Sequence, residues 1–111
     1  MPDPQPEQNK LTLTYRVEPG CLGPDGKDHI EGFCQFANRA VSTLDADFVN
    51  WQVIPRYDKS LPEMEFSVRG KSLPRSKAEQ YLAAIDADLD EFEAHLGDAL
   101  VRMIEAYRNR L

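Results

Sequence analysis

A glycine-rich stretch that leads into a helix holds the residue types of this chain that most suggest chemistry. Cys21, His29 and Cys34 lie close together within GCLGPDGKDHIEGFC (20–34). Thiolate sulfur and imidazole nitrogen bind structural zinc, which needs four such ligands, usually as two close pairs. The two cysteines do not form a C-x-x-C pair, and the other histidine, His95, is far along the sequence. We therefore expect no metal site and no cofactor.

The glycines of this stretch do not match a phosphate-binding loop. A P-loop needs the spacing G-x-x-x-x-G-K-[ST], but here Lys27 is followed by Asp28. The G-x-G-x-x-G fingerprint of dinucleotide sites is absent as well. We interpret Gly20, Gly23 and Gly26 as residues that permit positive φ angles in a compact turn.

Both cysteines are expected to be free thiols. The start of the chain has no apolar signal-peptide segment, so the reducing cytoplasm is the default compartment. Cys34 falls on an apolar helical stripe, whereas Cys21 is the more exposed residue and the candidate reactive thiol. No basic cluster flanks Cys21 to activate it. One alternative hypothesis nevertheless places the site of a small enzyme or ligand-binding protein at the Cys21 loop and His29.

Composition and motifs argue against several function classes. The chain has 111 residues, a net charge of −6 and a pI of about 4.8. These values disfavour binding to nucleic acids and to anionic membranes, which need clustered lysine and arginine. No apolar run is long enough to span a membrane. No Ser/His/Asp set or pair of catalytic carboxylates can be identified, so a role other than catalysis is favoured.

An acidic run covers Ala78–Val101, which holds seven acids and no lysine or arginine. Its D-x-D-x-D segment lacks the glycine and the distal glutamate of a calcium loop. A solvated helix face accounts for these acids, and the arginines that follow them suit the helix dipole. Two alternatives stay open: a docking surface for a basic partner such as the segment Arg56–Lys77, and an acidic decoy that mimics nucleic acid.

Alternation and helical periodicity predict five elements in the order β-α-β-β-α. The strands are expected over Leu11–Glu18, Phe48–Ile54 and Met64–Arg69, each with one buried face. One helix is expected from Asp28 and a second from Leu73–Ser76, each with capping-box spacing at its start. The second helix would be long and would run toward the C-terminus, either unbroken or broken near the glycine at position 97.

These elements predict one two-layer α+β domain over residues 10–111, after a disordered polar tail of residues 1–9. A split β-α-β arrangement places the third strand between the first two, in the sheet order 1-3-2, antiparallel or mixed. The two helices would then cover the dry face of a three-stranded sheet.

Two surfaces point toward protein partners. The C-terminal helix carries an apolar arc wider than such a small sheet can bury, which predicts a homodimer. The expected interface residues are Leu100, Val101, Ile104, Tyr107 and Leu111.

The second surface is the loop PRYDKSLPE (55–63), expected to join a hairpin and to bind a partner. Its contact residues would be Arg56, Tyr57, Lys59 and Leu61, since an aromatic ring beside arginine is typical of interface hot spots. The favoured hypothesis is therefore a small cytoplasmic binding or regulatory module that acts through protein contacts, with itself and possibly with another protein as partners.

Overall fold

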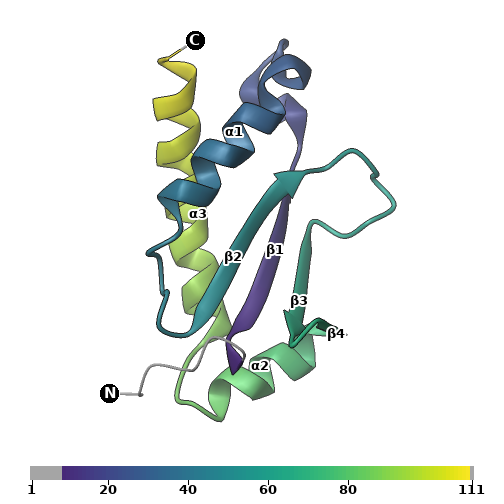
Figure 1. Ribbon diagram of the computed structural model, residues 1–111, viewed down its shortest axis with the longest axis vertical. Coiled ribbons are helices and arrows are strands. Elements are labelled where there is room, and N and C mark those ends of the chain that lie inside the picture. Colours follow the sequence, from purple (N-terminus) through teal and green to yellow (C-terminus); the bar gives the residue numbers. More distant parts are fainter. Residues whose placement is uncertain (1–8, 111) are drawn as a thin grey trace.

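The computed structural model describes residues 9–110, and in that range it has a four-stranded mixed sheet and three α-helices (Figure 1). The strands are β1 (Leu11–Val17), β2 (Val49–Pro55), β3 (Met64–Val68) and β4 (Lys71–Leu73). The helices are α1 (Gly26–Ala40), α2 (Arg75–Ala83) and α3 (Leu89–Arg108), and a short 3-10 helix, η2 (Pro19–Leu22), joins β1 to α1. The predicted α+β class with a long C-terminal helix is confirmed. No helix within residues 9–110 has the length and apolar content to cross a membrane.

The predicted sheet order was wrong, because β1, and not β3, lies between the other two of the three predicted strands. The observed order is β2-β1-β3-β4, with β1 parallel to β2 and antiparallel to β3. The 55–63 segment therefore joins no hairpin: it crosses the end of β1 and delivers β3 to the far side of that strand (Figure 1). A central position suits β1, whose inward residues Leu11, Leu13 and Val17 are almost fully buried.

The fourth strand was missed because Lys71–Leu73 was assigned to the approach to a helix. Arg69 and Gly70 both have positive φ angles, 55° and 79°, and they join β3 to β4. Two consecutive residues with positive φ are typical of the tight turn that connects antiparallel strands.

The C-terminal region holds two helices and not one. The chain turns after α2, where Asp86 adopts a positive φ of 59°, and α3 begins after Asp88, whose side chain accepts a hydrogen bond from the backbone N–H of Asp90. α3 then continues through Gly97 without interruption. Neither predicted capping box forms, because α1 begins at Gly26 and α2 begins at Arg75, both without a side-chain cap.

Two apolar clusters hold the helices on one face of the sheet. The first joins α1 and α3 to the sheet around Phe33, and the second joins α2 and the start of α3 to it around Leu82. The opposite face is polar, and on it the Thr14 hydroxyl donates a hydrogen bond to Gln52 at 3.1 Å.

The outer edge of β2 is closed by a side chain of α1. The amide of Asn38 donates to the Val53 carbonyl at 2.9 Å and accepts from the Val53 N–H at 2.7 Å. Asn38 therefore imitates a neighbouring strand at this point, and Pro55 has no N–H to offer. Such blocking disfavours the addition of an extended chain to this part of the edge.

Candidate functional site

A pocket of about 410 Å³ lies at the carboxyl ends of the parallel strands β1 and β2. Its walls come from the β1–α1 connection with the first turn of α1 and from the β2–β3 loop, segments that the sequence alone did not place together. We call it the strand-end pocket; it is lined by Glu18, Pro19, Gly20, Lys27, Arg56, Tyr57 and Lys59. The carboxyl ends of strands that precede a crossover helix are a common location for ligand sites.

Arg56 organises the β2–β3 loop from within. Its Nη1 donates to Glu18 Oε1 at 2.8 Å, and its Nη2 lies 3.2 Å from the Leu61 carbonyl and 3.4 Å from that of Lys59. The loop is thus wrapped around the guanidinium of Arg56. From the sequence we had expected this residue to contact a partner protein. Within the described chain, Arg56 Nε is buried without a hydrogen-bond partner.

Arg16 fixes the other end of the same loop, and sequence reasoning missed this role. The residue is only 9% exposed, its Nη1 donates to the Pro62 carbonyl at 2.7 Å, and its guanidinium pairs with Glu65 at 2.9 Å. Alternation had placed Arg16 on a solvated face. The sequence carried no signal for this burial, because long cationic side chains are rarely buried unless they are paired and the partners Pro62 and Glu65 are distant along the chain.

The outer surface of the pocket is aromatic and cationic. The Tyr57 ring is 67% exposed, and its hydroxyl donates to Glu31 at 2.9 Å, a hydrogen bond that raises the pKa of Tyr57. Lys27 and Lys59 are exposed, and neither forms an ion pair with another residue of the 9–110 range. The lining itself has three cationic residues and one acidic residue, Glu18, whereas the whole protein has a net charge of −6.

The glycine-rich connection shapes the pocket wall in a way that φ angles explain only in part. Gly23 has a positive φ of 99°, as expected, but Gly20 and Gly26 do not. A Cβ atom on Gly26 would lie 1.7 Å from the Pro19 carbonyl oxygen. Gly26 is therefore required for the close approach between η2 and α1 and not for backbone freedom.

Comparisons with known proteins identify no relative. No family model, curated protein or solved structure matches this chain. A function can therefore be inferred only from the arrangement of the residues themselves.

Cys21 and His29 do not line the strand-end pocket, so the structure does not bring them together there. Cys21 is exposed and Cys34 is buried, and burial, followed by the charge of Glu31, raises the pKa of Cys34 to about 11. In the described part of the chain, no group of three or more His, Cys, Asp or Glu side chains could hold a metal ion.

The predicted dimer surface is only partly open. Tyr107 is half-buried, and it packs edge-on against the core residue Phe33 with ring centroids 5.6 Å apart. Leu100 and Ile104 are half-buried against the same cluster, whereas Val101 is 60% exposed. Leu111 lies outside the described residues.

Part of the acidic run is neutralised within the molecule. Arg75 pairs with Asp90 at 2.9 Å, with Glu79 at 3.0 Å and with Glu93. The segment 56–77, suggested as a basic partner for this run, thus supplies one arginine that forms all three ion pairs. This neutralisation weakens the case for an acidic decoy, because three of its charges already have a cationic partner.

A further charge pair, missed in the sequence, ties α3 to the α1–β2 connection. His95 Nδ1 lies 2.8 Å from Asp45 Oδ2, and Asp45 adopts a positive φ of 49°. The hydrogen bond with Asp45 raises the pKa of His95, and the negative charges of Glu91 and Asp98 act in the same direction.

This pair predicts a pH-dependent contribution to stability. Because the folded state raises the pKa of His95, the contribution is complete below the ordinary value of 6.5 and is lost as the pH rises through the raised value. The stability difference between the wild type and His95→Gln should therefore shrink as the pH rises from the ordinary value of 6.5 through the raised pKa of His95, as measured by urea unfolding. A difference that stays constant or grows with pH would contradict the assignment.

Proposed function

We propose that the protein is a binding module that holds an acidic segment of a partner protein at the strand-end pocket. The observation that carries this proposal is the meeting of Lys27 and Lys59, which have no ion-pair partner among residues 9–110, with the exposed ring of Tyr57 around one pocket. Carboxylates of the partner would pair with the lysines, and an apolar side chain would lie against the tyrosine ring. The two free cysteines are compatible with action in the cytoplasm.

The loop is well suited to binding because most of its ordering is complete before a partner arrives. Arg16 and Arg56 hold it at its two ends, and Pro55 and Pro62 restrict its backbone. Less conformational entropy is then lost on association. Tyr57 and Leu61, which is 42% exposed, are two of the three large exposed hydrophobic residues in the described chain, and Val101 is the third.

Selection of peptides from a random display library tests the proposal. Peptides that bind the wild type should be enriched in aspartate and glutamate. Lys27→Glu and Lys59→Glu should each weaken binding of a selected peptide by roughly fivefold to tenfold, since each replaces attraction by repulsion at an exposed site. Tyr57→Ala should weaken it by a similar or larger factor.

Lys77→Glu provides the matched control, because Lys77 is an exposed lysine of α2 that does not line the pocket. It changes the net charge by the same amount and should leave peptide affinity nearly unchanged. Peptides without acidic enrichment, or equal losses from Lys77→Glu and Lys59→Glu, would refute the proposal.

We also propose a homodimer through α3, with Val101 at its centre. The specific observation in favour is that Val101 is the only large hydrophobic side chain exposed on a helix within residues 9–110. Sedimentation equilibrium at several concentrations should show dimers, and Val101→Glu should shift the protein to monomer. A wild type that stays monomeric at every concentration would rule out this contact.

A further inference from the structure

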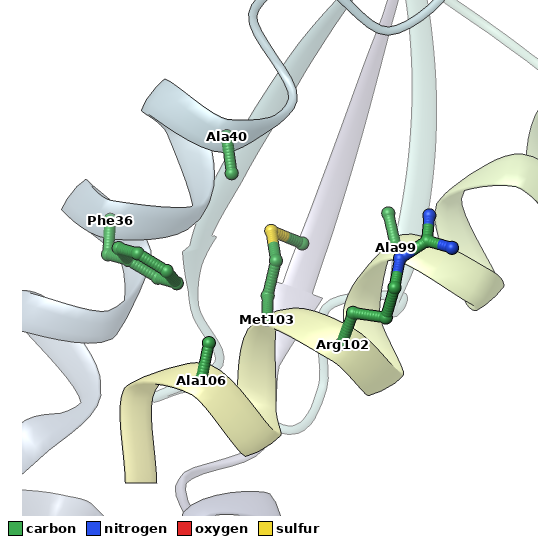
Figure 2. Close-up of a pocket in the computed structure, with 6 residues that line it drawn as sticks. All are labelled: Phe36, Ala40, Ala99, Arg102, Met103 and Ala106. Atoms are coloured by element: carbon green, nitrogen blue, oxygen red, sulfur yellow. The ribbon is translucent and has the colours of Figure 1, made fainter. Parts of the chain in front are cut away.

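A groove of about 270 Å³ lies between α1 and α3, and none of its lining residues belongs to the strand-end pocket. We call it the interhelical groove; it is lined by Phe36, Ala40, Ala99, Arg102, Met103 and Ala106. Figure 2 shows Phe36 and Ala40 of α1 on one side and Met103 and Ala106 of α3 on the other, with their side chains directed into the space between the helices.

The groove exists because alanines occupy positions where larger side chains would close the space. Ala40 and Ala106 are exposed, Ala99 is half-buried, and Met103 forms a floor that is 5% exposed. Five of the six lining residues are apolar. The surface can therefore accept large apolar side chains from outside.

The rim of the groove carries unpaired positive charge. Arg102 lines it directly, and the guanidinium of Arg110 lies over the Phe36 ring at 4.9 Å from the centroid. Neither arginine forms an ion pair with any residue between 9 and 110. An apolar floor beside unpaired arginines is complementary to a segment that has both an apolar face and acidic residues.

We propose that the interhelical groove binds an acidic amphipathic helix of another protein. Its apolar side chains, at helical spacing, would insert between α1 and α3, and its carboxylates would pair with Arg102 and Arg110. A helix fits better than an extended segment, since the two walls are helices whose backbone groups bond within themselves. An extended peptide would need partners for its own backbone, and at Val53 the β2 edge is already taken by Asn38.

This inference does not depend on the strand-end pocket or on the proposed dimer. The pocket is built from the β1–α1 connection and the β2–β3 loop, and it shares no lining residue with the groove. Val101 is not among the residues that line the groove either.

A pair of labelled peptides tests the inference. The first is a designed helix with leucines on one face and glutamates on the other, and the second carries lysine in place of every glutamate. Fluorescence anisotropy should show that the glutamate peptide binds and that the lysine peptide does not. Arg102→Glu should weaken binding of the glutamate peptide by roughly fivefold to tenfold.

Methionine methyl NMR locates the contact. The chain has three methionines, of which Met103 lies in the groove and Met64 lies in β3. Addition of the glutamate peptide should shift the methyl signal of Met103 and leave that of Met64 in place. A shift at Met64 without one at Met103 would place the peptide elsewhere and overturn the inference.

Arg108→Glu is the matched control, since Arg108 is also on α3 but lines a different surface with Glu105 and Asn109. Arg108→Glu should leave the affinity for the glutamate peptide unchanged. If it lowered this affinity as much as Arg102→Glu does, the effect would come from net charge alone and the inference would be overturned. Binding of the lysine peptide would do the same. Dimers that form without peptide and are abolished by Ala40→Glu would show that a second copy of this chain occupies the groove, against the inference.

Discussion

Gly26→Ala should lower the free energy of unfolding by roughly 3 kcal/mol, an unusually large cost for the addition of one methyl group. The added Cβ would lie 1.7 Å from the Pro19 carbonyl oxygen, and this neighbour is backbone, which cannot rotate away as a side chain can. η2 and the start of α1 must therefore separate. Urea unfolding followed by the fluorescence of Trp51, the single tryptophan, measures the effect.

Gly97→Ala separates this clash from the general consequences of a glycine-to-alanine change. Gly97 is exposed within α3, and nothing lies within 4 Å of the position of its added Cβ. Alanine should therefore stabilise the protein by up to about 1 kcal/mol through helix propensity. If Gly26→Ala were as stable as the wild type, the tight contact between η2 and α1 would be wrong, and with it the shape of the strand-end pocket.

Phe33→Ala should lower the free energy of unfolding by about 3–5 kcal/mol. The ring is 0% exposed, lies at the centre of the cluster that joins α1 to α3, and contacts Tyr107 edge-on at 5.6 Å. Its removal leaves a cavity where two helices and the sheet meet. Since small domains are stable by only about 5–15 kcal/mol, much of the total would be lost. Thermal and urea unfolding measure the change.

Tyr57→Ala is the control for Phe33→Ala, because it removes an aromatic ring that is 67% exposed. Its effect on stability should stay near 0.5 kcal/mol or below, as is usual for surface substitutions. A small loss in Phe33→Ala, comparable to that of Tyr57→Ala, would mean that α1 does not pack as described.

The elements of the fold were largely readable from the sequence, because each depends on a local period. Leu11, Leu13 and Val17 alternate with polar residues, and the structure buries all three. Ile30, Phe33 and Ala37 recur at helical spacing, and they form the buried face of α1. Local periodicity could not show that the chain turns at Asp86 or that a turn at Arg69 and Gly70 leads into a fourth strand. Both turns depend on positive φ angles, which periodicity does not reveal.

Only part of the candidate binding surface could be predicted. Tyr57, Leu61 and Val101 are exposed, as expected. Their exposure could be predicted because it depends on local features, a loop bounded by prolines and a wide apolar arc on one helix. Arg56 and Tyr107, which were assigned to contacts with partners, also have contacts within the molecule, with Glu18 and with Phe33. Residue type and spacing do not distinguish an arginine that bonds to its own loop from one that is free to bind a partner protein.

By itself, the sequence determined the α+β class, the buried face of each main element and the absence of the common phosphate-loop and zinc-finger spacings. These properties follow from residue type and from spacing along the chain. Tertiary structure alone decided that β1 is the central strand, that Gly20 and Lys27 meet Arg56 and Tyr57 around one pocket, and that α1 and α3 leave a groove lined by alanines. The reason is that sheet order and helix packing are set by contacts between residues far apart in the chain, and the competing orders share the same local pattern.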